Sequence, residues 1–259
     1  MTVAPPAPLR RLKLLSFNVQ TGLRTESYPA LMTGSVRQVF PSRKRLPNLR
    51  RITRFLGPFD IVGLQEVDGG SLRSHRLVQT QYLADEAGFP YWHNQVNRHL
   101  APFALHSNGL ISRLQPHAVT DYPLPGLPGR GAILAQFGAR PETALHLIVT
   151  HLALSQRARM QQMAFLGSLL HDVPHAIVMG DFNCGPDAPE MQFLVREAGL
   201  KAPGKVIPSW PSWKPQRMID HVLVSPSLRI VHQETLPLRI SDHLAMAVEV
   251  ELPVGLEME

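Results

Sequence analysis

The stretch "IVMGDFNCGPD", residues 177–187, places an acid and an amide directly after residues that favour a protein core. A run as apolar as Ile-Val-Met predicts a buried strand, and the Gly-Asp-Phe-Asn-Cys-Gly-Pro that follows is typical of a turn. Asp181 and Asn183 are ordinary turn residues, because such side chains bond their own backbone. On this stretch alone a structural role is the simpler interpretation, so the rest of the chain must decide whether the two residues carry chemistry.

The composition is that of a globular protein with a sizeable core, since 44% of the 259 residues are hydrophobic and 18% are charged. With no internal repeat and no long linker, we expect a single domain over residues 1–259, in which residues 1–10 form a flexible tail. No run approaches the roughly 18 apolar residues of a membrane helix, and prolines stand where a signal peptide would be apolar. The single cysteine, Cys184, excludes an internal disulfide, and we expect a cytoplasmic protein.

The net charge of +6 is unevenly distributed along the chain. Residues 1–60 contain 11 lysines and arginines against two acidic residues, whereas the remainder contains 15 against 18. This asymmetry indicates a polyanionic partner, either nucleic acid or an anionic membrane surface, with a merely solvated surface as the alternative. The basic residues in question include Arg43, Lys44, Arg45, Arg50, Arg51 and Arg54.

Apolar runs and amphipathic segments alternate along the chain. Strands are expected at residues 12–19 and 60–65 and at the runs "NGLIS", "GAILAQF", "ALHLIVT", "IVMG", "HVLVS" and "LAMAVEV". Helices are expected near residues 49–56, 71–87, 156–171 and 191–198, and residues 25–46 read as an irregular segment. Interleaved strands and helices favour an α/β protein whose sheet and helix layers share one core.

Polar residues stand at the ends of these strands. Four strands finish on a polar group and two late strands begin on one, so one rim of a mixed sheet would gather all of them. Each residue alone has a structural explanation, but eight such coincidences at one rim favour a functional site. The eight are Asn18, Glu66, His151, Asp181, Asn183, Asp220, Asp242 and His243.

The chemistry available to this cluster is limited. Several carboxylates and an Asn carbonyl make a hard oxygen site suited to Mg²⁺ or Mn²⁺. The sequence has no cysteine cluster and no His-Glu-x-x-His, which argues against zinc, and it has no Gly-x-Ser-x-Gly elbow for a serine hydrolase. A hard cation with paired His and Asp groups suits the attack of water on a phosphorus ester.

The chain resembles the endonuclease/exonuclease/phosphatase superfamily, which includes deoxyribonuclease I, abasic-site endonucleases, neutral sphingomyelinases and inositol polyphosphate 5-phosphatases. The resemblance rests on "LLSFNVQTG", "IVGLQEVD", "IVTHLALS", "MGDFNCGPD", "RMIDHVLVS" and "SDHLAMAVEV", in the family's order. It implies an α/β four-layer sandwich, with two packed mixed β-sheets and helices on the outer faces. It also implies a divalent-metal-dependent phosphoesterase that uses Mg²⁺ or Mn²⁺, with Glu66 as the principal metal ligand and Asn18 and Asp242 beside it.

The resemblance also implies the catalytic roles. Asp181 would orient or deprotonate the attacking water, and Asn183 would hold a phosphate oxygen. His243 would contact the scissile phosphate while Asp220 fixes its tautomer, and His151 would be the second histidine on the phosphate. A carboxylate behind an imidazole raises its basicity and fixes its ring.

Five further residues are candidates for substrate binding. Asn108 and Arg113 resemble the family's substrate-facing middle strand, and Arg130 lies in a Gly-Arg-Gly like that of abasic-site endonucleases. Leucines replace the Tyr and Asn that precede this motif in those enzymes, which argues against abasic-site cleavage. Trp210 and Trp213 would stack on bases, or else pack a proline-rich loop onto the domain.

The sequence therefore predicts a metal-dependent phosphodiesterase, with a nuclease as the first expectation and nucleic acid as its substrate. A phospholipid or phosphoinositide phosphoesterase at an anionic membrane is the alternative, because the basic segment would serve a membrane surface equally well. A non-catalytic polyanion-binding module is the alternative of another class. The retention of all eight polar residues argues against it.

Overall fold

A computed structural model describes residues 10–25, 27, 41–42, 44–100, 102–126, 128–202 and 204–258. The expected tail, apart from Arg10, lies outside the described residues, as do Arg43 and most of the segment 25–46. Two mixed β-sheets form the centre of the molecule. The first sheet runs in the order β10 (Arg229–Thr235), β11 (Met246–Glu251), β1 (Arg11–Asn18), β2 (Ile61–Asp68), β4 (Ala104–Ser112) and β3 (Tyr91–Leu100). The second runs β5 (Ala118–Pro123), β6 (Gly131–Phe137), β7 (Leu145–His151), β8 (Ala176–Asp181) and β9 (Asp220–Val224).

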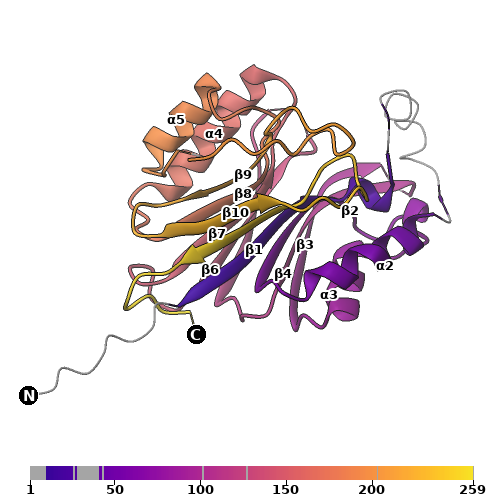
Figure 1. The fold of residues 1–259 in the computed structure, drawn as a ribbon, viewed down its shortest axis with the longest axis horizontal. Coiled ribbons are helices and arrows are strands. Elements are labelled where there is room, and N and C mark those ends of the chain that lie inside the picture. Colours follow the sequence, from indigo (N-terminus) through magenta and orange to yellow (C-terminus); the bar gives the residue numbers. More distant parts are fainter. Residues whose placement is uncertain are drawn as a thin grey trace, which may run out of the picture.

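Helices cover the outer faces of both sheets (Figure 1). Two of them, α2 (Arg45–Leu56) and α3 (Gln79–Ala87), pack on the first sheet, and α4 (Gln156–Leu170) and α5 (Pro189–Glu197) pack on the second. Two short 3₁₀ helices, η1 (Gln20–Gly22) and η2 (Leu72–Ser74), follow β1 and β2. The α/β four-layer sandwich expected from the sequence is confirmed. Within the described residues, no helix is both long and apolar enough to cross a membrane.

The strands that carry the site are buried on both faces. In β1, Leu12 and Leu14 enter the core between the sheets, whereas Leu15 and Phe17 enter the core under α2 and α3, as the two-residue period of a strand requires. The sheets pack tightly at Gly63 of β2, where a Cβ atom would lie 2.8 Å from the Met179 side chain. Each large apolar side chain buried in these layers contributes about 1.5–3 kcal/mol, so the strand ends are held on a rigid base.

The helix expected over residues 71–87 is divided in two. It breaks between η2 and α3, where His75 and Arg76 adopt positive φ angles of 56° and 63°. The cause is the buried carboxylate of Asp68, which accepts hydrogen bonds from the hydroxyls of Ser71 and Ser74 and forms an ion pair with the fully buried Arg73. The chain wraps around this carboxylate instead of continuing as a helix.

Candidate functional site

The predicted polar cluster forms where the strands of both sheets end, rather than along the rim of one mixed sheet. In the second sheet, His151 pairs with Asp181 across the parallel strands β7 and β8, and Asp181 pairs with Asp220 across the antiparallel strands β8 and β9. Gly180 allows this close pairing, because a Cβ atom there would lie 1.9 Å from the Thr150 carbonyl oxygen. The glycine before Asp181 is therefore required by the backbone.

The turn after β8 directs the two oxygens of Asp181 to different tasks. Asn183 has a φ angle of 55°, and its backbone N–H donates to Oδ1 of Asp181 at 2.9 Å, which is a local turn bond of the Asx type. The Nδ2 of Asn183 donates to the Leu152 carbonyl at 2.9 Å. The turn interpretation of "GDFN" is therefore correct for Oδ1, while Oδ2 remains available to the site.

In the first sheet, a β-bulge sets the direction of Glu66. The pairing of β2 with β4 shifts between Leu64 and Val67, and Glu66 has a φ angle of 55°. Bulges of this kind redirect a side chain, and a non-glycine residue in the left-handed region costs on the order of 1–3 kcal/mol, a strain that is concentrated at functional sites. Glu66 accepts a hydrogen bond of 3.2 Å from Nδ2 of Asn18, at the end of β1.

Three side chains from both sheets converge on Oδ2 of Asp181. Asn18 donates to it from Nδ2 at 3.1 Å, and the Nε2 atoms of His151 and His243 lie 3.4 and 3.7 Å away. All four side chains are at least nine-tenths buried. Burial raises the pKa of Asp181 to about 7, against the opposing effect of His243. Asp181 can therefore exchange a proton near neutral pH.

His243 is held as a cation by the carboxylates around it. Its Nδ1 lies 2.8 Å from Oδ2 of Asp220, which also accepts a hydrogen bond from the Ser209 hydroxyl. Burial alone would lower the pKa of His243, but Asp220, Asp181 and Asp242 together raise it well above its ordinary value. The proton on Nδ1 is thereby fixed, and Nε2–H points towards the reacting side of the site.

His151, in contrast to His243, is a neutral imidazole. Burial lowers its pKa well below the ordinary value, and the neighbouring Arg130 lowers it further. The Nη1 of Arg130 lies 3.0 Å from Nδ1 of His151. Because a guanidinium can only donate, Nδ1 must accept and the ring proton must lie on Nε2. The two histidines therefore present a neutral and a charged N–H to the same place.

A hard divalent cation fits the acidic side of this site. Burial and the neighbouring Asp242 raise the pKa of Glu66, as expected for a buried carboxylate with a second carboxylate nearby. The group of three that could hold a metal is Asp181, Asp220 and His243, whose ligand atoms lie within 4.8 Å of one another. Because His243 already shares its Nδ1 proton with Asp220, the oxygens of Glu66, Asn18 and Asp242 are the better match for Mg²⁺ or Mn²⁺.

The structure separates the five substrate-binding candidates. Arg130 lies in the site through its contact with His151. Asn108 is buried and donates from Nδ2 to the Gly131 carbonyl. Arg113 is at the other end of the first sheet, so its prediction as a substrate-facing residue is wrong in position. Arg113 directly follows the end of β4, whereas Asn108 lies in the middle of that strand. The Arg113 guanidinium donates to three backbone carbonyls and covers the ring of Phe89.

The tryptophan-containing loop lies beside the site. Its Ser212 donates from the backbone to the Asp242 carbonyl and from the hydroxyl to the Ser241 carbonyl. Trp210 and Trp213 are half-buried, and the Arg217 guanidinium lies 5.6 Å from the centre of the Trp210 ring. Base stacking by the two tryptophans therefore stays a prediction, while the loop itself supports the segment that carries Asp242.

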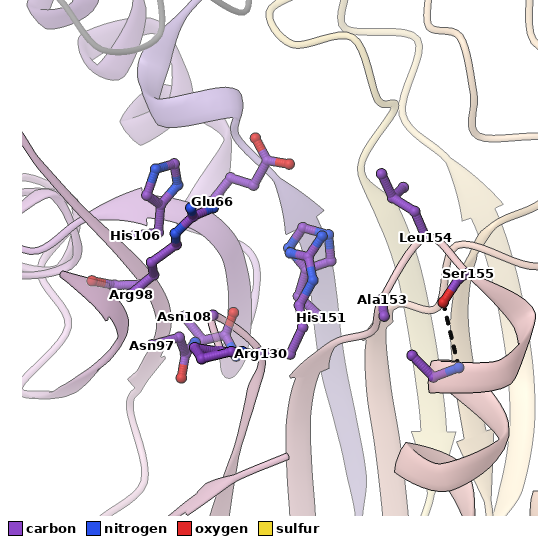
Figure 2. Close-up of a pocket in the computed structure, with 14 residues that line it drawn as sticks. Glu66, Asn97, Arg98, His106, Asn108, Arg130, His151, Ala153, Leu154 and Ser155 are labelled. Atoms are coloured by element: carbon purple, nitrogen blue, oxygen red, sulfur yellow. Dashed lines mark hydrogen bonds between the residues drawn. The ribbon is translucent and has the colours of Figure 1, made fainter. Parts of the chain in front are cut away.

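A cavity of about 490 Å³ opens next to Glu66 and His151 (Figure 2). Its other walls come from the β3–β4 hairpin, from the loop before β6 and from the start of α4. The sequence pointed to Asn108 and Arg130 of this lining, but the part contributed by β3 was missed, because β3 is a partly exposed edge strand without an apolar run. The cationic and imidazole side chains that the β3–β4 hairpin adds to the site are Arg98 and His106.

Comparisons with known proteins agree with this architecture. A model described as "Endonuclease/Exonuclease/phosphatase family" matches residues 15–243. Protein YbhP of Escherichia coli is 29% identical over 238 residues, covering 82% of this chain and 91% of YbhP. An endonuclease/exonuclease/phosphatase from Beutenbergia cavernae has a TM-score of 0.73 at 19% identity, covering 95% of this chain and 72% of that chain.

Two further solved structures share the fold. A mannosyl-6-phosphatase of Bacteroides thetaiotaomicron has a TM-score of 0.66 at 16% identity, covering 92% of this chain and 99% of that chain. The catalytic domain of human Nocturnin, with a bound sulfate anion, has a TM-score of 0.65 at 17% identity, covering 93% of each chain. At such identities these neighbours establish the architecture, and the chemistry must be argued from the site.

Proposed function

The chain belongs to the endonuclease/exonuclease/phosphatase family, and from this premise we propose that it hydrolyses a phosphoric ester with the help of Mg²⁺ or Mn²⁺. The observation that carries the proposal is the convergence on Asp181. One carboxylate oxygen has the amide of Asn18 and the Nε2 atoms of His151 and His243 within 3.1–3.7 Å. A carboxylate of raised pKa among N–H donors is suited to activate water.

Glu66, with Asn18 and Asp242, would hold the cation. When bound, the cation would offset negative charge on the phosphoryl oxygens and help to orient the ester. The paired carboxylates support this assignment, because the pKa of Glu66 is raised by burial and by Asp242, an arrangement that a divalent cation would relieve.

The remaining roles follow from the charge states. Asp181 accepts the proton of the attacking water, because its pKa of about 7 keeps much of it ionised at neutral pH. His243 donates from Nε2–H as a cation, and His151 donates from Nε2–H as a neutral ring, so both suit the oxygens of a phosphoryl group. The Nδ2 of Asn183 carries a second hydrogen that the Leu152 carbonyl does not use, and this hydrogen would hold another phosphoryl oxygen.

Nucleic acid remains the substrate that the sequence favours, on the strength of the basic residues before position 60. Arg45 must be removed from this set of basic residues. It is buried and donates to the Thr21 carbonyl at 2.7 Å, so it cannot contact a polyanion. A compact phosphoric ester, including a lipid headgroup, is a second candidate. It is favoured by the cavity beside Glu66 and His151, because a cavity of this size matches a small ligand.

A substrate panel tests the proposal. Phosphate or product release is measured with bis-p-nitrophenyl phosphate, p-nitrophenyl phosphate, plasmid DNA, RNA and phosphoinositide vesicles, first with Mg²⁺ or Mn²⁺ and then with excess EDTA. We expect hydrolysis of at least one ester that EDTA abolishes and that Glu66→Gln lowers at least ~10²-fold. The exposed Glu86 on α3 provides the control, since Glu86→Gln should match the parent. Full activity in EDTA, or no hydrolysis of any ester, would contradict the proposal.

A further inference from the structure

The cavity beside the catalytic groups is lined by two arginines, Arg98 and Arg130, and by one carboxylate, Glu66 (Figure 2). Glu66 and His151 form the side that faces the catalytic groups, and Arg98, His106 and Arg130 contribute to the remainder. In a substrate whose reacting phosphate lies at His151 and His243, a neighbouring group would extend into this space.

Arg98 is the most distinctive part of the lining. Its aliphatic stem packs on the loop before β6, since a Cβ atom at Gly129 would lie 3.2 Å from Arg98 Cδ. Gly129 has a φ angle of +113°, a conformation that favours glycine. Among the described residues, the Arg98 guanidinium has no ion pair and no side-chain hydrogen bond. Its charge therefore lies at the cavity without a carboxylate of the described residues at ion-pair distance.

Arg130 adds a second guanidinium without a carboxylate at ion-pair distance within the described part of the chain. Its hydrogen-bond partner is the neutral Nδ1 of His151, at 3.0 Å. Burial lowers the pKa of Arg130, and the nearby Arg98 also lowers it. The carboxylates of Glu66 and Asp181 raise it and so oppose both effects. The two guanidinium groups line the same cavity, and an anion bound there would relieve the repulsion between them.

The rest of the lining is compatible with an anion. Burial, together with Arg73 and Arg98, lowers the pKa of His106 to about 4, so the ring is neutral at physiological pH and can donate one N–H. The Ser155 hydroxyl accepts the hydrogen bond that caps α4, from Ala158 N, which leaves its own hydrogen to donate. The first turn of a helix of this length adds a partial positive charge.

We propose that this cavity binds a second anionic group of the substrate, a phosphate or carboxylate other than the one hydrolysed, and that Arg98 is a specificity-determining residue. The inference rests on the proposed function, because it assumes that the reacting phosphate lies at His151, Asp181 and His243. It narrows the substrate to a phosphoric ester with a second negative charge a few bonds from the reacting phosphorus.

Such an ester could be a soluble compound or a lipid headgroup, because exposed apolar side chains next to the cavity would also suit a membrane surface. Leu154 lines it and is 77% exposed, and Phe103, at the tip of the β3–β4 hairpin, is 53% exposed. The doubly anionic compound is therefore either a soluble metabolite or a lipid headgroup reached from a membrane surface. Both sources offer the same recognition chemistry, and separate substrate pairs distinguish them.

The experiment compares esters that differ in the second anionic group, with Mg²⁺ in excess. The soluble pair is fructose 1,6-bisphosphate and fructose 6-phosphate, and the vesicle pair is phosphatidylinositol 4,5-bisphosphate and phosphatidylinositol 4-phosphate in phosphatidylcholine. The ratio of kcat/KM within each pair is measured for the parent, Arg98→Ala, Arg98→Lys and the control Arg196→Ala, at an exposed arginine of α5. We expect a ratio of at least about 10 in one pair, the size of a charged hydrogen bond. Arg98→Ala should bring it close to one, while Arg98→Lys retains part and Arg196→Ala retains all of it.

Three outcomes would overturn the inference. One is a ratio near one in both pairs for a parent that still shows metal-dependent hydrolysis. Another is an equal loss of the ratio in Arg98→Ala and Arg196→Ala, which would indicate a general effect of surface charge. The third is the absence of metal-dependent hydrolysis with every ester, which would overturn the proposed function as well. Melting temperatures of all variants are recorded, and since the Arg98 residue is exposed, no loss of folding is expected.

Discussion

The Nδ1 atom of His243 lies 2.8 Å from Oδ2 of Asp220, and this contact joins the loop before β11 of the first sheet to the start of β9 in the second. Both side chains are buried. Because the same Asp220 oxygen also accepts the Ser209 hydroxyl, its position is fixed independently of His243. The pair therefore sets both the tautomer and the charge of the imidazole.

Replacing Asp220 should affect the chemistry through His243. In Asp220→Asn the carboxylate that most strongly raises the pKa of His243 is lost, so the imidazolium should deprotonate at lower pH. We expect kcat to fall by about 10–100-fold, the usual effect of an outer partner of a catalytic imidazole. The alkaline limb of the pH–rate profile should also move to lower pH. A fall in kcat with an unmoved alkaline limb would contradict this assignment.

Replacing Asp181 should remove catalysis without weakening the fold. The variant Asp181→Asn keeps the shape but loses the base, and kcat should fall by ~10² or more. In the parent, kcat/KM should rise with pH through about 7, as Asp181 ionises, and fall again above the raised pKa of His243. A bound divalent cation favours the carboxylate, so the acid limb should move to lower pH as Mg²⁺ is added.

The exposed Asp85 on α3 provides the matched control, because Asp85→Asn removes the same charge away from the site. Its kinetics and its melting temperature should equal those of the parent. Loss of the fold in Asp181→Asn, detected by circular dichroism, would mean that the residue is structural.

Glu66 should destabilise the metal-free protein and stabilise the metal-bound one. Its pKa is raised in the folded state by burial and by Asp242, so its ionised form costs stability as pH rises through its unfolded value of about 4.3. In EDTA at pH 8, Glu66→Gln should therefore raise Tm, by roughly 2 °C or more. The parent should gain stability on adding Mn²⁺, in proportion to the logarithm of its concentration above Kd. A lower Tm for Glu66→Gln in EDTA would refute this account.

Asp68 should behave in the opposite way. Burial alone would raise its pKa, but the backbone N–H of Ser71, the Arg73 guanidinium and the Ser74 hydroxyl together lower it below 3.8. Its contribution to stability is therefore present above that value and is lost as pH falls through the lowered pKa. Asp68→Asn leaves Arg73 buried beside a neutral group and should cost about 3–5 kcal/mol, measured by urea unfolding at pH 7. The exposed Asp172 is the control, and Asp172→Asn should cost nothing measurable.

Much of the site could be predicted because its residues end strands that are buried on both faces. An apolar run that stops at Asn18, Glu66, His151 or Asp181 is visible in the sequence, and the alternation of parallel and antiparallel pairs brings these ends together. The β-bulge that turns Glu66 into the site was not predictable, because a bulge depends on pairing with a partner strand rather than on local residue type.

Residues on half-exposed strands were harder to place. In the edge strand β3, apolar and polar residues alternate only weakly, and both faces carry polar residues. The cavity wall that contains Arg98 therefore had no strand pattern recognisable in the sequence. A count of charged residues also takes no account of burial. Arg45 counts as a surface cation in the sequence, but its side chain is only 3% exposed in the structure. Pattern and composition thus indicated residues that the fold brings together at one site, but of the cavity lining beside them they indicated only Asn108 and Arg130.

The last prediction concerns the exposed arginines of α2. Arg50, Arg51 and Arg54 are all exposed, and α2 covers the outer face of the first sheet (Figure 1). If they contact phosphates, binding to duplex DNA should weaken with salt by about 0.9 in log–log slope per contact. Changing all three to Ser should therefore reduce the slope by roughly two to three units.

Binding is best measured by fluorescence anisotropy in the Asp181→Asn background with EDTA, so that the DNA stays intact. Arg196→Ser is the control, since Arg196 is an equally exposed arginine on α5, and it should leave the slope unchanged. Loss of binding to anionic vesicles with unchanged DNA binding would assign α2 to a membrane surface instead, in agreement with a lipid substrate. An unchanged slope on both would mean that the arginines of α2 are merely solvated, and the preference for a nucleic acid would then lose its physical basis. The cavity beside His151 would remain as the determinant of substrate choice, because its cations lie next to the reacting groups whereas those of α2 lie on an outer layer of the fold.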